Sequence, residues 1–301
     1  MSTEAVKPKF TIKDFKAASP RWCANCGDYG ALVAIRKFMF DAQLNPAETV
    51  HVSGIGCSGR MPHYINTYGF HGIHGRAIPI ALGVALARPD LNLFIESGDG
   101  DALSIGANHL VHGISKNFNC VFILLDNQIY GLTKNQTSPT TRQGHATNTQ
   151  PGGTWIDPVN PVQFALGLGC SFVASTADWL GDHFVQTLDA AFRHKGFSFV
   201  HVAQTCPKFN PAAWDNQSEE WFDFLVHSKG LAPDSRSPNA KIIEHDPSDL
   251  GSAFQYADLS RKRFGLFYQN SSKACYDELL RNATQNAPKK NRSELLNQYA
   301  I

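Results

Sequence analysis

The sequence predicts an α/β fold built on a doubly wound, mostly parallel β-sheet. Residues 91–97 and 119–125 are nearly continuous apolar runs, which is typical of strands buried on both faces of a parallel sheet. A segment of helical length joins the two runs, so together they predict a βαβ unit. Strand and helix signals go on alternating as far as residue 206, which favours one sheet covered by helices.

The predicted elements divide the chain into three parts. Residues 1–20 form an extended N-terminal arm, residues 21–231 the folded domain, and residues 232–301 a polar C-terminal tail with a helical stretch near 272–282. Within the domain, apolar periodicity predicts further helices and strands. The predicted helices are 31–40, 77–87, 161–169 and 184–192, and the strands outside the βαβ unit are 49–53, 171–174 and 197–203.

The composition excludes two broad classes of function. Lys and Arg together number 27 and Asp and Glu 26, so no basic field attracts nucleic acid. No apolar run approaches the ~20 residues of a membrane helix, and the first ten residues lack the apolar core of a signal peptide. We therefore expect a cytoplasmic protein with no membrane segment, whose cysteines, odd in number at 7, stay reduced.

Oxygen-bearing side chains follow both strands of the βαβ unit. Asp99 comes directly after the first strand, and Asp126 and Asn127 come at the end of the second. Ligands of open α/β sheets bind at the carboxyl ends of strands, where these side chains meet. Gly98 and Gly100 let the backbone approach a ligand closely and expose N–H groups to it. Carboxylate and amide oxygens suit Mg²⁺, which in turn holds a phosphorylated ligand.

Four cysteines form a second candidate site. Cys23 and Cys26 make a C-x-x-C pair just before the helix 31–40, while Cys57 and Cys206 each follow a strand-like run. The pair fits a redox dithiol, half of a zinc site or half of an iron–sulfur site. A second C-x-x-C, expected of a zinc ribbon, is absent, and Pro207 after Cys206 is typical of ferredoxin-type ligation. The remaining cysteines lie in apolar or helical surroundings and are predicted core or surface residues: Cys120, Cys170 and Cys275.

Residues 54–59 read Gly-Ile-Gly-Cys-Ser-Gly and match the G-x-G-x-x-G pattern of dinucleotide sites. That pattern must open a helix, but Pro62 and the loop to Gly69 interrupt one. The acidic residue expected about 20 positions later is also missing from residues 75–81. We therefore interpret this loop as a wall of a different ligand pocket.

The Gly98-Asp99-Gly100 motif followed 28 residues later by Asn127 resembles the thiamine diphosphate signature. In that signature the Asp, the Asn and the carbonyl two residues after the Asn bind Mg²⁺. The resemblance therefore implies Mg²⁺ on Asp99, Asn127 and the carbonyl of Ile129. The pattern usually ends in Asn-Asn, whereas this chain has Asp126-Asn127, so the ligating Asn is kept.

The motifs between residues 20 and 230 resemble one family, the thiamine-binding β subunit of the 2-oxoacid:ferredoxin oxidoreductases. They are Trp-Cys-x-x-Cys-Gly, Gly-Ile-Gly-Cys-Ser-Gly, His-Gly-Arg, Gly-Asp-Gly-Asp, Tyr-Gly-Leu-Thr and Cys-Pro, in that order over residues 20–230. The match is closest to the branch that acts on 2-oxoglutarate. It implies a thiamine-diphosphate-binding fold with a 4Fe–4S cluster on Cys23, Cys26, Cys57 and Cys206. Soft thiolate ligands suit such a cluster.

The resemblance also implies a reaction and its partners. The reaction is thiamine-dependent oxidative decarboxylation of a 2-oxoacid with coenzyme A to acyl-CoA and CO₂, reversible in principle, with electrons passing through the cluster to ferredoxin. The glutamate that activates the thiamine pyrimidine ring comes from the α subunit in this family. We therefore expect an αβ pair or an (αβ)₂ assembly.

The motif positions supply the remaining site residues. By resemblance, the thiamine pocket is lined by Gly56, Cys57, Ser58, His74, Gly98, Asp99, Gly100, Asp101, Asn127, Ile129, Gly131, Leu132 and Thr133. His74 is a candidate for donating to phosphate or moving protons near the reactive carbon. Arg60 directly follows the Gly54–Gly59 loop, and its planar guanidinium suits the distal carboxylate of 2-oxoglutarate. We assign it that role as a hypothesis, beside the alternatives that it braces the loop, contacts the α subunit or meets coenzyme A phosphates.

Three other functions fit part of the pattern. A pyruvate-specific or broad-range member of the same family would share every motif. A non-redox thiamine-dependent decarboxylase or synthase would keep Asp99 and Asn127 but would not need four cysteines at these places. A pure electron carrier would leave Asp99 and Asn127 unexplained. Iron, sulfide and thiamine contents of the purified protein distinguish the last two.

Overall fold

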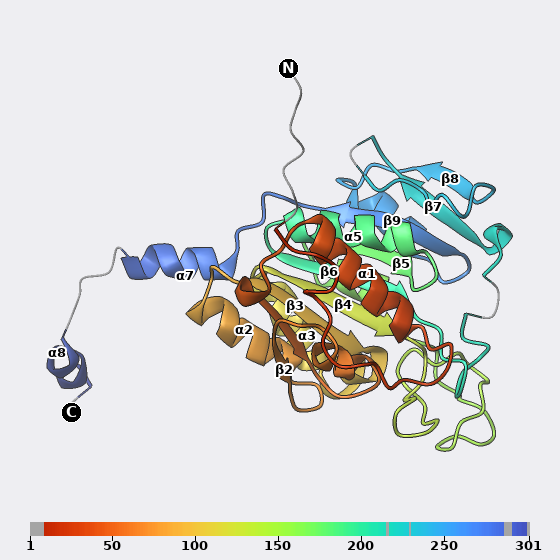
Figure 1. Cartoon of the computed structure of the whole chain (residues 1–301), viewed down its shortest axis with the longest axis horizontal. Helices are drawn as coiled ribbons and strands as arrows, with labels where there is room; N and C mark the ends of the chain where they lie inside the picture. Colours follow the sequence, from red (N-terminus) through yellow and green to blue (C-terminus); the bar gives the residue numbers. More distant parts are fainter. Residues whose placement is uncertain (1–8, 215–216, 229, 286–290, 300–301) are drawn as a thin grey trace.

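The structure is a computed structural model that describes residues 9–214, 217–228, 230–285 and 291–299. Within these residues nine strands form one sheet in the order β2-β1-β3-β4-β6-β5-β9-β7-β8 (Figure 1). The strands are β1 (Thr49–Ser53), β2 (Tyr68–His71), β3 (Asn92–Gly98), β4 (Cys120–Asp126), β5 (Phe172–Ala177), β6 (Phe197–Ala203), β7 (Phe222–Val226), β8 (Lys241–Glu244) and β9 (Lys262–Gln269). All pairs are parallel except β5 with β9, so the predicted mostly parallel sheet is confirmed.

Helices cover both faces of the sheet, as a doubly wound fold requires (Figure 1). They are α1 (Asp28–Asp41), α2 (Ala77–Ala87), α3 (Ala107–Lys116), α4 (Pro161–Gly167), α5 (Gly181–Arg193), α6 (Leu250–Tyr256), α7 (Tyr276–Gln285) and α8 (Arg292–Asn297). In the described part of the chain, none of the helices has the length and apolar character needed to cross a membrane.

Alternate residues of the central strand β4 face two separate cores. Phe122 and Leu124 pack in a core with α2, α3, α4 and α6, while Val121 and Ile123 pack in the other core with α1 and α5. Every residue of β4 is buried, which explains its continuous apolar sequence. The helices predicted at 31–40 and 77–87 and the strands predicted at 49–53 and 197–203 are confirmed as α1, α2, β1 and β6.

The chain order reverses between β1 and β3. From β1 the chain continues to β2 on one side, and after β3 it continues to β4 on the other. Connections that leave neighbouring strands in opposite directions open a crevice at the strands' carboxyl ends. The Gly54–Gly59 loop and the Gly98-Asp99-Gly100 turn leave β1 and β3 at this crevice, so the topology puts both motifs at one place.

The C-terminal region differs from the predicted tail. Residues 241–244 and 262–269 form β8 and β9, and β9 pairs antiparallel with β5, so this region extends the main sheet. A buried charge also obscured β7 in the sequence: its Asp223 is 2% exposed and accepts two hydrogen bonds from Arg261. An ion pair lets a carboxylate enter a core that apolar periodicity alone assigns to hydrophobic residues. The helix predicted near 272–282 is confirmed as α7.

The N-terminal arm is only partly described, because residues 1–8 lie outside the described residues. Its described end is packed on the domain: Phe15 is fully buried, and Ala17 N–H donates to the Tyr64 carbonyl at 3.1 Å. The predicted extended arm is therefore anchored by an aromatic side chain before the chain reaches Cys23.

Acid should weaken the fold through His183 of α5. This side chain is 1% exposed, its Nδ1 lies 2.8 Å from Thr176 Oγ1, and burial lowers its pKa from 6.5 to about 4. The unfolded chain takes up the proton near its ordinary pKa and the folded chain does not, so stability present above pH 6.5 is lost as pH falls toward 4. Between pH 7 and pH 5 we expect a loss of about 2 kcal/mol from this residue.

Urea unfolding of the purified protein and of His183→Gln at the two pH values measures this contribution. The variant should lose about 2 kcal/mol less on acidification. A glutamine in place of His112, which is exposed on α3, serves as the matched control and should leave the pH dependence as in the wild type. An equal acid loss in His183→Gln and the wild type would contradict the prediction.

Candidate functional site

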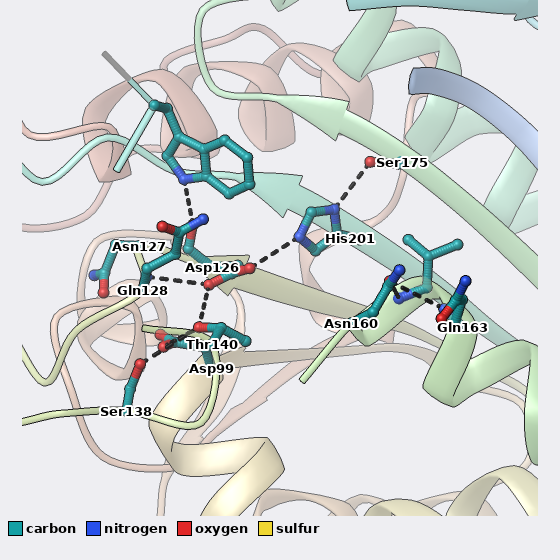
Figure 2. Close-up of polar contacts among 12 residues, drawn as sticks. Asp99, Asp126, Asn127, Gln128, Ser138, Thr140, Asn160, Gln163, Ser175 and His201 are labelled. Atoms are coloured by element: carbon teal, nitrogen blue, oxygen red, sulfur yellow. Dashed lines mark hydrogen bonds and ion pairs between the residues drawn. The ribbon is translucent and has the colours of Figure 1, made fainter. Parts of the chain in front are cut away.

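Two buried carboxylates meet at the carboxyl ends of β3 and β4. Asp99 is 2% exposed and Asp126 is 1% exposed. The hydroxyl of Thr140 lies between them, 2.7 Å from Asp99 Oδ2 and 2.8 Å from Asp126 Oδ1 (Figure 2). Burial, and next the charge of Asp126, raise the pKa of Asp99 to about 7. A divalent cation would relieve both effects, because it compensates the buried negative charge.

The turn after β4 presents the other predicted cation ligands. Asn127 Oδ1 accepts the Ile129 N–H at 3.1 Å, and Asp126 Oδ1 accepts the Gln128 N–H at 3.1 Å. The Asn210 amide donates to the carbonyls of Asn127 and Gln128 at 3.1 and 3.3 Å. These bonds hold Gln128 at φ 60°, a left-handed conformation that a non-glycine residue rarely adopts. The amide oxygen of Asn127 and the carbonyl of Ile129 therefore belong to one fixed turn.

His201 of β6 orients Asp126 from the side opposite Thr140. Its Nε2 lies 3.1 Å from Asp126 Oδ2 and its Nδ1 lies 2.9 Å from Ser175 Oγ of β5 (Figure 2). With Ser175 donating to Nδ1, Nε2 carries the proton and donates to the carboxylate. The Trp214 indole donates to the Asp126 carbonyl at 2.8 Å. Sequence reasoning missed His201 and Ser175, because each occupies an ordinary position in a strand.

The loop between β4 and α4 covers this edge of the sheet. This long loop is partly buried, because its hydroxyl residues Ser138, Thr140 and Thr141 are 2–4% exposed. Thr141 Oγ1 donates to the Gln128 carbonyl at 2.7 Å, and Ser138 N–H donates to Thr141 Oγ1 at 2.8 Å. The run Ser138-Pro-Thr-Thr was the available signal, since hydroxyls gathered beside an acidic motif can serve as its donors.

The glycines around Asp99 are required by close packing. A Cβ atom on Gly100 would lie 2.3 Å from the Tyr130 ring, whose hydroxyl donates to the Gly100 carbonyl at 2.9 Å. A Cβ atom on Gly98 would lie 3.2 Å from Ser58 Oγ, on the loop after β1. The motif thus lets the β1 loop and the β4 turn close around Asp99.

Asp101 links three segments of the crevice. Its Oδ1 accepts the N–H groups of Ile55 and Gly75 at 3.0 and 2.7 Å and lies 2.5 Å from His74 Nδ1. Its Oδ2 accepts the Ser97 hydroxyl at 2.5 Å. A carboxylate that accepts from Nδ1 fixes the imidazole tautomer, so the half-buried His74 ring keeps a lone pair at Nε2. Asp101, predicted to line a pocket, thus also holds that pocket's loops in place.

The four predicted cluster cysteines gather from three loops. Cys57 is near enough to Cys206 and Cys23 for their charges to raise its pKa, and Cys26 feels the charge of Cys57 in the same way. Burial is the larger cause, followed by the carboxylate of Asp28, and together these effects raise the pKa of Cys57 to about 12. The spacing of residues along the chain did not predict that Asp28 would be fully buried next to these cysteines.

Gly131 borders the space between two of the sulfurs. A Cβ atom there would lie 3.5 Å from Cys206 Sγ and 3.8 Å from Cys57 Sγ, so a side chain at this position would be in van der Waals contact with both cysteines. The Trp22 indole donates to the Cys57 carbonyl at 2.8 Å, and this bond fixes the β1 loop against the segment that carries Cys23. A groove of about 700 Å³ opens beside Cys26 and Cys206.

The other three cysteines lie in the core, one of the two locations predicted for them. Cys120, Cys170 and Cys275 are 4%, 0% and 3% exposed. Within the described residues, no three His, Cys, Asp or Glu side chains converge as the ligands of a single metal ion do.

Arg60 and the segment after Gly131 are less closely tied to the acid pair. Arg60 donates to the Arg21 carbonyl at 3.0 Å, and its guanidinium lies 5.8 Å from the Tyr64 ring centroid. Leu132 is 46% exposed, and the Thr133 hydroxyl donates to the Gln136 side chain at 2.5 Å. Arg60 is thus held on the side of the crevice that faces the cysteines and the N-terminal arm.

Comparison with known proteins adds three findings. Residues 54–202 match the family model described as "Thiamine pyrophosphate enzyme, C-terminal TPP binding domain". The 2-oxoglutarate oxidoreductase subunit KorB of Mycobacterium tuberculosis is 40% identical over 269 residues, which cover 89% of this chain and 68% of the relative. The β subunit of 2-oxoacid:ferredoxin oxidoreductase 1 of Aeropyrum pernix is 38% identical over 86% of this chain and 80% of the relative.

The fold also matches a solved structure. The 2-oxoglutarate:ferredoxin oxidoreductase of Magnetococcus marinus, solved with 2-oxoglutarate, coenzyme A and succinyl-CoA bound, contains a chain that superposes with a TM-score of 0.85. The match covers 97% of both chains at 30% identity, so it includes the C-terminal strands that the sequence did not predict.

Proposed function

Because this chain belongs to the family of 2-oxoacid:ferredoxin oxidoreductase β subunits, we propose that it catalyses, with an α subunit, thiamine-dependent oxidative decarboxylation of 2-oxoglutarate. Coenzyme A accepts the succinyl group, so the products are succinyl-CoA and CO₂, and the electrons pass to ferredoxin. One observation carries this proposal: residues 126–131 form a single turn that serves two donor sets. Asn127 and Ile129 lie in the turn after Asp126, which shares the Thr140 hydroxyl with Asp99, and Gly131 borders the sulfurs of Cys57 and Cys206.

The oxygen donors fit Mg²⁺. Asp99, Asn127 Oδ1 and the carbonyl of Ile129 would hold the ion, which prefers hard oxygen ligands and binds the diphosphate of the cofactor. The buried acid pair supports this assignment, because burial raises the pKa of Asp99 and a cation would offset the cost. Thiamine diphosphate, when bound, supplies the electron sink for decarboxylation. Gly56, Ser58, Gly98, Gly100, Leu132 and Thr133 would line its pocket.

The sulfur donors fit a 4Fe–4S cluster on Cys23, Cys26, Cys57 and Cys206. A single zinc ion would need its ligands drawn to one point, and the described residues hold no such group of three. A four-iron cluster takes one thiolate on each of four irons and so spreads its ligands more widely. The cysteines disfavour a non-redox thiamine enzyme, which has no need of them.

His74 is the proposed proton-handling residue of this chain. Asp101 holds its Nδ1, so Nε2 is the nitrogen that can accept a proton or contact phosphate at the crevice. The glutamate that activates the pyrimidine ring is assigned to the α subunit, so the active site is completed in an αβ or (αβ)₂ assembly. A pyruvate-specific or broad-range enzyme remains the second candidate, since relatives of this chain carry both 2-oxoglutarate and 2-oxoacid names.

Removing the carboxylate of Asp99 should strongly weaken Mg²⁺-dependent binding of the cofactor. Asp99→Ala in the αβ complex should weaken Mg²⁺-dependent thiamine diphosphate binding by more than about 100-fold, the upper end for losing an outer partner of a metal ligand. Calorimetric titration of the cofactor measures the effect, and iron content should not change. Asp90→Ala, an exposed aspartate paired with Arg88, is the control and should bind as the wild type does. Wild-type affinity in Asp99→Ala would remove Asp99 from the site.

Serine in place of Cys23, Cys26, Cys57 or Cys206 should deplete iron and labile sulfide. A hydroxyl is a poor replacement for the soft thiolate that such a cluster prefers. Iron and sulfide are assayed in anaerobically prepared protein, with Cys275→Ser expected to retain both. Zinc without labile sulfide in the wild-type protein would contradict the cluster assignment.

Replacing Arg60 with Met tests the proposed role in substrate choice. If its guanidinium binds the distal carboxylate, the ratio of kcat/KM for 2-oxoglutarate to kcat/KM for pyruvate should fall. The loss corresponds to about 1.5–3 kcal/mol of discrimination free energy, the range for a hydrogen bond to a charged group. Arg88→Met, an exposed arginine paired with Asp90, is the control. An equal fall for both substrates would instead make Arg60 a brace of the loop, in line with its bond to Arg21.

A further inference from the structure

Gln204 connects the two donor sets. It is the first residue after β6 and is 1% exposed. Its backbone N–H donates to the Asp126 carbonyl at 2.9 Å, at the end of β4. Its side-chain amide points the other way, and Nε2 lies 3.5 Å from Cys26 Sγ and 2.8 Å from the Thr205 carbonyl. One buried residue is thus fixed to the cation-site strand and donates toward a sulfur.

The contact with Cys26 is shielded from water. Cys26 is 8% exposed, and both partners are buried, so the amide dipole acts in a medium of low dielectric constant. The amide carries no titratable proton, so it is a donor at any pH. The Asp28 carboxylate contacts the same sulfur, with Oδ2 3.4 Å from Cys26 Sγ. A negative charge there disfavours added negative charge on the sulfur, whereas the Gln204 N–H favours it.

We propose that Gln204 raises the reduction potential of the cluster through its N–H···S contact with Cys26; this inference rests on the proposed 4Fe–4S site. Reduction adds one electron to the cluster, and the added negative charge is shared by its sulfurs. An N–H dipole aimed at a sulfur stabilises the reduced form more than the oxidised form, and hydrogen bonds to sulfur are among the determinants of cluster potential. Gln204 is a positioning residue in this role, because it acts on the cluster through Cys26.

The position of Gln204 between the two donor sets relates the raised reduction potential to electron transfer from the thiamine site to the cluster. Its backbone holds the strand end next to Asn127, where the thiamine cofactor is proposed to bind, and its side chain holds a cluster ligand. A higher potential makes the cluster a better acceptor of electrons released at the thiamine. The residue would therefore bias electron flow toward the cluster in the oxidative direction.

The test is the midpoint potential of the cluster in the intact αβ complex. Gln204→Met keeps the length and burial of the side chain but removes the N–H donor. Redox titration followed by electron paramagnetic resonance should show a potential lower by about 59 mV, a tenfold drop in the ratio of reduced to oxidised cluster at a fixed ambient potential. The same change at the exposed Gln163 of α4 is the control and should leave the potential unaltered.

Iron and sulfide assays separate the possible failures. A wild-type complex without a cluster overturns the proposed function and this inference together. An intact cluster with unaltered potential in Gln204→Met overturns this inference alone. If that variant assembles no cluster, Gln204→Asn, whose amide is one methylene shorter, takes its place and should also show a lowered potential. Loss of the cluster from both variants would mean that Gln204 is needed for cluster assembly, and this result would also overturn the inference.

Discussion

The contact of Thr140 with two buried carboxylates is the interaction on which the rest of the site depends. Asp99 and Asp126 end neighbouring strands, so the sheet itself forces the two acids together, and burial makes their mutual repulsion costly. The Thr140 hydroxyl offsets part of that cost and in doing so folds the β4–α4 loop over the strand ends. His201 offsets more of it from the opposite side. The negative charge of these two carboxylates, which destabilises the fold, also makes the site suitable for a divalent cation.

This edge of the sheet contains both a strained backbone and buried titratable side chains. Gln128 is held in a left-handed conformation, a backbone cost of order 1–3 kcal/mol for a non-glycine residue. Asp28 and Cys57 have raised pKa values because burial disfavours their charged forms. The two apolar cores on either face of the sheet stabilise the fold against these costs. The fold can therefore tolerate a left-handed non-glycine residue and buried titratable groups at the edge where ligands would bind.

Much of the fold was predictable because its elements are long and apolar. β1, β6 and α2 begin and end where the pattern placed them, since burial on the sheet requires those residues to be apolar. β8 and β9 were not predictable in the same way. β8 is a short and largely exposed strand, and β9 begins with Lys262 and Arg263, so neither shows the apolar pattern that marks a buried strand.

The sequence by itself determined the chemical character of the site, because acids, glycines and cysteines at fixed spacings after strands have few other uses. It placed Asp99, Asn127, Cys57 and Cys206 after strands and Cys23 and Cys26 just before a helix, and the fold brings these segments together. Only the tertiary structure decided which residues support them. Thr140, His201 and Gln204 lie far from Asp99 in sequence, and their roles depend on hydrogen bonds of 2.7–3.5 Å that no local pattern encodes. The chain specifies the candidate ligands locally, but it specifies their orientation through the packing of the whole sheet.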